Sequence, residues 1–107
     1  MCRILVNLAE LKSACKRLLA TIDDECDVGT ESVRFTTDRD SLHIETLRSS
    51  ETVLARVLER GQKSVPCALL RNMALTLRFY RKRKIDIAVS DGELRIERMA
   101  FRNPLPN

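Results

Sequence analysis

The residues best suited to chemistry in this sequence form a basic segment in its second half, residues 78–84 (RFYRKRK). It contains five basic residues, two aromatic residues and no acidic residue. Cations attract phosphates and aromatic rings stack on bases, so this composition is typical of a nucleic-acid contact. The same cations would also be favoured at a helix C-terminus, where the helix dipole is negative. The pattern alone leaves both interpretations open.

Groups for catalysis or metal binding are sparse. The four cysteines, Cys2, Cys15, Cys26 and Cys67, show no CxxC spacing, and the lone His43 has no second ligand nearby. The three glycines form no phosphate-binding loop, and His43 has no nucleophile in its sequence context. We therefore predict no metal, no cofactor and no enzymatic activity, with free thiols in a reducing compartment.

Size and composition restrict the class of protein. A chain of 107 residues with 44% hydrophobic residues is predicted to form one domain, residues 1–107, with a modest core. A net charge of +4 favours an acidic partner without naming one. The N-terminus lacks the apolar core of a signal peptide, and no stretch approaches the roughly 20 apolar residues of a membrane span. We expect a cytoplasmic protein without a membrane partner.

One motif occurs twice. Residues 33–47 and 85–99 align at an offset of 52, with apolar residues matching apolar residues and alternating with period two. The alternation predicts two β-hairpins, each with one buried face. Their predicted turns are residues 38–41 and 90–93, and the Asp91-Gly92 pair is the stronger signal because glycine accepts positive φ.

An amphipathic helix precedes each hairpin. Asn7 is a predicted N-cap with Glu10 three residues later, and apolar residues from Leu8 to Ile22 follow the spacing of one buried face. The second helix is predicted to carry Pro66 in its first turn. Residues 51–58 fit a helix or a strand, and their β-branched residues favour a strand. With a final strand at 100–102, the order is βαβββ twice, in copies at about 1–58 and 62–103.

Two segments of this order resemble one domain of a DNA sliding clamp. They are Val65-Pro66 at the start of the second helix and the closing hairpin with Ile85, Ile87, Asp91-Gly92, Leu94 and Ile96. The likeness covers nearly the whole chain and is closer to the bacterial β-clamp than to the eukaryotic and archaeal form. The resemblance implies an α+β fold in which two helices pack on an antiparallel sheet.

The resemblance also implies a function. Six such domains would form a ring, with helices lining a central hole and cations near the DNA backbone. Clamps perform no chemistry; they tether polymerases and other enzymes to DNA. Known clamp chains carry two or three domains, so this chain would be either a fragment or a single-domain relative that self-associates or works without a ring.

Cations on the outward helix faces are the candidate DNA contacts. Such contacts need only long cationic side chains on one surface and are independent of sequence. The alternative is an ordinary solvated helix face. Together with two residues of the basic segment, the candidates are Lys12, Lys16, Arg17, Arg71, Arg78, Arg81 and Lys82.

Leu75 and Phe79 fall on the helix side opposite the buried residues. If the helix extends that far, they could contact a partner chain. Alternatively, the helix ends near Leu77 and Phe79 folds back into the core.

The acidic loop at 23–31 corresponds in the repeat to the basic segment. It lacks the ligand spacing of a calcium loop, so we assign its carboxylates to solvent. Opposite charges in corresponding loops could steer head-to-tail self-association. The loop's carboxylates are Asp23, Asp24, Glu25, Asp27 and Glu31.

Two functions remain open. The first is a clamp-type domain that binds DNA without sequence preference as part of an oligomer or ring, and tethers replication or repair proteins. The second is a clamp-like protein-interaction or regulatory module that does not itself bind DNA and docks through an exposed sheet edge.

Overall fold

The structure is a computed structural model that describes residues 2–21 and 32–102. Its elements follow the predicted order, βαβββ twice. The first copy comprises β1 (Cys2–Asn7), α1 (Leu8–Ala20), β2 (Ser32–Asp38), β3 (Ser41–Glu45) and β4 (Ser50–Glu59). The second comprises β5 (Gly61–Pro66), α2 (Cys67–Leu77), β6 (Lys84–Ser90), β7 (Glu93–Ile96) and β8 (Met99–Arg102).

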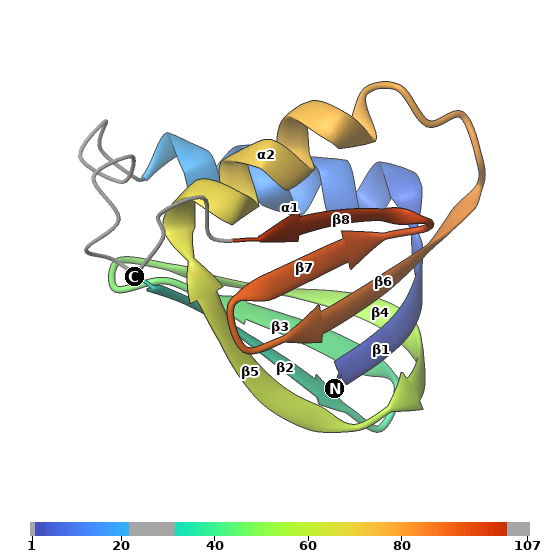
Figure 1. Ribbon diagram of the computed structural model, residues 1–107, viewed down its shortest axis with the longest axis horizontal. Helices are drawn as coiled ribbons and strands as arrows, with labels where there is room; N and C mark the ends of the chain where they lie inside the picture. The colour runs from blue at the N-terminus through green and yellow to red at the C-terminus, as the bar shows by residue number, and fades with distance from the viewer. Residues whose placement is uncertain (1, 22–31, 103–107) are drawn as a thin grey trace.

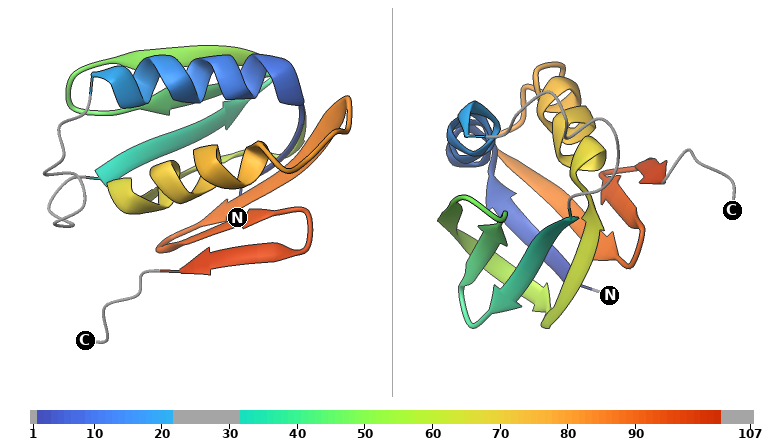
Figure 2. Two further views of the ribbon diagram at one scale, coloured as in Figure 1. Left: turned by 90° about the horizontal axis from the view of Figure 1, so that it is seen from above. Right: turned by 90° about the vertical axis from the view of Figure 1, so that its left-hand side faces the viewer.

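The strands form one antiparallel sheet that bends around the core, and both helices cover its concave face (Figures 1 and 2). The strand order is β5-β2-β3-β4-β1-β6-β7-β8. The inward side chains of the strands and helices, such as Phe35, Leu11 and Leu70, are fully buried in one cluster. Burying a side chain of this size stabilises a fold by about 1.5–3 kcal/mol, so this layer holds the helices on the sheet.

The predicted repeat of the hairpin is confirmed. Strands β2 and β6 begin and end at equivalent residues, and β3 and β7 are each separated from the preceding strand by two residues. In the second turn Gly92 has φ of 77°, and a Cβ there would meet no atom within 4 Å. The glycine is therefore needed for its backbone conformation rather than for space.

The two copies differ in their last strand. Ser41 pairs with Leu54 as Glu93 pairs with Arg102, so β8 corresponds to the first half of β4. The second half of β4 continues across the molecule and pairs with β1, from Val6–Ala55 onward. In the described part of the chain β8 pairs only with β7. β4 therefore joins β3 to β1 in the middle of the sheet, whereas β8 is the last strand at one end of the sheet.

The predicted helix start is confirmed for α1 and wrong for α2; α1 ends at Ala20, and Ile22, the last residue of its predicted apolar row, lies outside the described residues. The Asn7 side chain accepts a hydrogen bond from the Glu10 backbone N–H at 3.0 Å, as a capping residue should. Pro66, by contrast, is the last residue of β5 and has an extended ψ of 145°, so α2 begins at Cys67. The prediction was wrong by one residue, because a φ of −58° suits both conformations and only ψ separates them.

The cysteine prediction is confirmed in part. Cys2 and Cys15 are free and buried. Cys67 is disulfide-bonded, so the expectation of a free thiol is wrong at this residue. The acidic loop, Asp23 to Glu31, lies outside the described residues. No helix in 2–21 or 32–102 has the length and apolar character to cross a bilayer.

Candidate nucleic-acid interface

The two helices lie side by side and antiparallel on the concave face of the sheet (Figure 2). Their inward rows are fully or largely buried, which leaves the opposite rows facing away from the sheet. This arrangement brings the end of α2 close to the start of α1. We call the outward surface of α1, α2 and the basic segment 78–84 the helical face.

A depression of about 480 Å³ lies between the helices. Lys12 and Lys16 of α1 line it on one side, and Arg78, the residue that follows α2, lines it on the other. Its apolar lining comes from Leu19 and Ala74, which pack partly against the core. Three predicted DNA contacts from two helices are thus brought together in one place.

A second depression, of about 340 Å³, lies at the start of α1. The basic segment curves past the first turn of α1 here, and the Leu8 backbone N–H donates to the Arg83 carbonyl at 3.0 Å. Lys12 lines this depression as well as the first, so the two adjoin. The other cations lining it are Arg81, Lys82 and Arg83. Together the two depressions form a basic trough along one side of α1.

Arg83 belongs to this trough but was absent from the predicted site. Its membership in the basic segment was visible in the sequence. Its contact with α1 was not, because the Leu8–Arg83 hydrogen bond joins residues far apart in the chain.

The predicted cations differ in their charge partners. Arg17 donates to the Glu51 carboxylate on β4 at 2.8 Å, and Lys82 pairs with Glu97 at 3.2 Å. In contrast, Lys12, Lys16, Arg78 and Arg81 form no ion pair within the described residues. Arg71 is half-buried on α2 and lines neither depression. Arg83 and Lys84 of the basic segment also form no ion pair with a described residue, so the positive field of the helical face comes mainly from these six cations.

The Arg17–Glu51 pair also fixes the position of α1. The hydrogen bond to Glu51 raises the pKa of the Arg17 guanidinium above its usual value, so this side chain stays charged. Near the same end of the helix, the Thr21 and Ser49 hydroxyls lie 2.9 Å apart. The contacts tie the last turns of α1 to β4 and its preceding turn.

The predictions for the end of α2 were half correct. The helix does end at Leu77, as one alternative proposed. Phe79 does not fold back into the core, however, because 85% of its surface is exposed. Backbone hydrogen bonds from Phe79 to Thr76 and from Tyr80 to Leu77 form a turn, and Tyr80 is the aromatic that packs against the core. Leu75 is 48% exposed on the outward side of α2.

His43 has ordinary hydrogen-bond partners on the sheet. Its Nδ1 lies 2.8 Å from the Thr52 hydroxyl, and its Nε2 lies 3.3 Å from the Ser41 hydroxyl. Both ring nitrogens of His43 therefore have a hydroxyl partner on the sheet. Among the described residues no cluster of metal-ligating side chains occurs.

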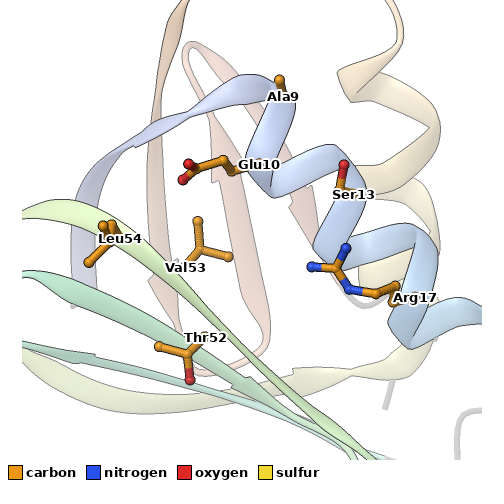
Figure 3. Close-up of a pocket in the computed structure, with 7 residues that line it drawn as sticks. All are labelled: Ala9, Glu10, Ser13, Arg17, Thr52, Val53 and Leu54. Atoms are coloured by element: carbon orange, nitrogen blue, oxygen red, sulfur yellow. The ribbon is translucent and has the colours of Figure 1, made fainter.

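A second candidate surface lies between α1 and β4. A gap of about 420 Å³ separates the first turns of α1 from the first half of β4. Figure 3 shows Glu10 and Arg17 extending from α1 toward the strand, with Thr52, Val53 and Leu54 on the other side. The gap is present because β1 ends at Asn7, so its pairing with β4 stops at Ala55.

The gap exposes a strand edge. The Ala55 backbone N–H bonds to the Asp40 carbonyl on the β3 side. Backbone groups alternate in direction along a strand, so those of Thr52 and Leu54 point to the opposite edge, beside α1. Leu54 is also 68% exposed. This edge could accept an additional strand.

Of the two ends of the sheet, one is covered. At β5 the Ser64 carbonyl accepts a hydrogen bond from the Gly92 N–H, and Lys63 lies 3.8 Å from Asp91. The β6–β7 turn therefore covers that end. At β8, the half-exposed Met99 lies on the last strand of the sheet.

Comparisons with known proteins give a fold. No protein-family model and no curated protein sequence matches the chain. The solved structures of two bacterial DNA polymerase III beta subunits are similar to it, one from Borrelia burgdorferi in complex with a natural product and one from Thermotoga maritima. The TM-scores are 0.68 and 0.66, with 13% and 15% identity, over 92% of this chain in both cases.

The chain spans only 26% and 27% of those subunits, about a quarter of their length. At such low identity the likeness concerns the fold alone. The predicted fold, two helices on an antiparallel sheet as in one domain of the bacterial β-clamp, is confirmed.

Proposed function

We propose that this chain is a clamp-type domain that binds duplex DNA without sequence preference through its helical face. The observation that carries the proposal is a set of cations without ion pairs, among them Lys12, Lys16, Arg78 and Arg81, on the helical face of a clamp-domain fold. Long cationic side chains suit phosphates. Contacts from such side chains to phosphates would position DNA without specifying its sequence.

The proposal includes assembly into an oligomer or ring. One chain has about a quarter of the length of the similar beta subunits, so enclosing DNA would require several copies or further domains. The open edges of β4 and β8 lie on different strands, which suits head-to-tail contacts between copies. The assembled domain would tether polymerase or other replication and repair proteins to DNA, and would itself have no catalytic activity.

Reversing two free cations tests DNA binding. We expect the double variant Lys16→Glu/Arg78→Glu to bind a labelled random-sequence duplex roughly tenfold more weakly at low salt, or worse, because two phosphate contacts become repulsive. Fluorescence anisotropy measures the affinity. The matched control is Arg56→Glu/Arg60→Glu, which makes the same charge change at exposed residues of β4 and the turn after it.

The control separates local contacts from net charge. Equal weakening by both double variants would mean that only the overall charge attracts DNA and would remove the helical face from the account. Circular dichroism and thermal melting of each variant exclude loss of fold as the cause.

The second candidate function is a protein-interaction module that does not bind DNA. It is favoured by the open edge of β4 beside the 420 Å³ gap, with exposed Leu54 at its rim. Added strands gain affinity from main-chain hydrogen bonds, and neighbouring pockets give selectivity.

Thr52→Pro tests this edge. Proline lacks the N–H that points toward α1 but leaves the β3-facing ladder intact, so it should be tolerated as on other edge strands. We expect the variant to weaken self-association measured by sedimentation velocity, or capture of a strand-adding partner. Thr52→Val is the control, because it removes only the hydroxyl that bonds His43. Unchanged assembly in the proline variant would exclude the β4 edge.

A further inference from the structure

The most exposed aromatic side chain described in this protein lies inside its most basic segment. Phe79 is 85% exposed and follows Arg78, which lines the first depression. Tyr80 comes next and lines the second depression. Phe79 therefore belongs to the short stretch of chain that joins the two halves of the basic trough.

The segment is held at both ends. At its start the Phe79 N–H donates to the Thr76 carbonyl at 3.0 Å, and the Tyr80 N–H donates to the Leu77 carbonyl at 3.3 Å. At its end the Arg83 carbonyl accepts from the Leu8 N–H at 3.0 Å. Since Tyr80 also packs against the core, Phe79 is presented by an anchored turn. A preorganised ring loses little freedom when it binds a ligand.

The charge around Phe79 restricts the ligand. Residues 78–84 contain five cations and no acid, and only Lys82 is neutralised by a described partner, Glu97. Lys12 and Lys16 extend the cations along α1. A polyanion with regularly spaced charges fits this extended trough better than an isolated acidic patch on a protein does.

The ring itself distinguishes two kinds of polyanion. In a duplex the base faces are stacked on one another, so an exposed phenyl ring meets only backbone and groove edges. In a single strand the base faces are free, and stacking on an aromatic side chain is favourable for every base. Alternating cations and aromatics, as in Arg78-Phe79-Tyr80-Arg81, are the elements that such binding uses.

We propose that the segment 78–83 forms a binding site for single-stranded DNA, in which Phe79 stacks on an unpaired base while Arg78, Arg81 and Lys12 contact the flanking phosphates. The site deepens the proposed function, on which it rests for the nucleic-acid-binding role of the shared cations. It adds a preference for unpaired nucleotides that the helix cations alone would not give.

The test compares a labelled dT oligonucleotide with a duplex. We expect Phe79→Ala to raise the Kd for the oligonucleotide about tenfold, since stacking of one base is lost, and to leave duplex affinity within about twofold. Leu47→Ala is the control, because Leu47 is 80% exposed, similar to Phe79, but lies in the β3–β4 connection. It should change neither affinity.

A tryptophan variant supplies a second readout. The chain contains no tryptophan, so Phe79→Trp creates a single fluorophore at the proposed site. We expect it to retain oligonucleotide binding and its fluorescence to be quenched on stacking with a base. Unquenched tryptophan fluorescence of this variant at saturating oligonucleotide would overturn the proposal.

The outcomes separate this inference from the proposed function. Duplex binding with no effect of Phe79→Ala on the oligonucleotide leaves the proposed function intact and overturns the stacking site. If the oligonucleotide binds in a Phe79-dependent way and the duplex does not bind, the stacking site is supported and the proposed duplex binding is wrong. If Phe79→Ala alters the sedimentation coefficient but not oligonucleotide binding, Phe79 contacts a protein and the inference is wrong.

Discussion

The helical face and the outer face of the sheet carry the same kinds of cation in different electrostatic settings. On the outer face Arg3 pairs with Asp86 at 2.7 Å, and Arg34 lies 3.7 Å from Glu45 directly across the β2–β3 ladder. On the helical face Lys16 and Arg78 face solvent with no ion pair to any described residue. Arg3 and Arg34 on the outer face balance neighbouring carboxylates, whereas the cations between the helices leave a positive field available to a ligand.

The contrast recurs within a single turn of α1. Lys16 lines the trough, while its neighbour Arg17 turns the other way and is bound to Glu51. Counting basic residues on a helix would treat the two alike. Their partners indicate different roles, one in binding and one in positioning the helix.

Neutralising Lys16 and Arg17 in separate variants tests whether an ion pair determines which of the two cations binds DNA. We expect Lys16→Gln to weaken duplex binding several-fold and to reduce the slope of log K against log salt by about one. Arg17→Gln should change binding much less, because its charge is already compensated by Glu51. Anisotropy titrations of both variants at several salt concentrations measure this. Equal losses would show that pairing does not determine which cations act.

Removing the carboxylate partner of a paired cation is the complementary test, because it makes that cation available to DNA. Glu51→Gln leaves Arg17 without its carboxylate partner, so we expect duplex affinity to rise roughly twofold. Asp86→Asn is the matched control, because it releases Arg3 on the outer face and should give no comparable gain. A larger gain from the control would place the DNA contact on the sheet.

The last prediction concerns stability rather than binding, in the core beneath the helical face. Burial raises the pKa of the Cys15 thiol from 9.0 to about 12. The unfolded chain would ionise this thiol near pH 9 while the folded chain keeps it protonated, so folding stability should fall as pH rises from about 9 toward 12. Urea unfolding of the wild type and Cys15→Ala should therefore diverge over this range. If the free energies of unfolding of the wild type and of Cys15→Ala depend on pH in the same way, the Cys15 thiol is not buried beneath α1.

The local elements of the fold could be predicted because their signals lie within short stretches. Alternation in β2 and β6 fixed which residues face the core, and Asp91-Gly92 located a turn. The Asn7 cap and the burial of Leu11 followed from helical spacing in the same way. The error at Pro66 was a single residue at a boundary, where local signals are weakest.

The candidate site was only partly predictable because its decisive features join distant parts of the chain. Helical periodicity places Arg17 on an outward face, but its Glu51 partner lies 34 residues away on β4. The exposure of Phe79 depended on whether it or Tyr80 would cover the core after Leu77. Both side chains are aromatic, so composition could not decide between them. Charge pairing and burial are tertiary properties, and sequence patterns set only the faces on which they occur.

The salt dependence of duplex binding by the wild-type chain tests the central claim most directly. With five unpaired cations in the trough, Lys12, Lys16, Arg78, Arg81 and Arg83, we expect log K to fall linearly with log salt, with a slope of about −4 to −5 between roughly 50 and 200 mM. Duplexes of different sequence should give the same line. Absence of binding at the lowest salt, or affinity independent of salt, would contradict the assignment of the helical face as a DNA-binding surface.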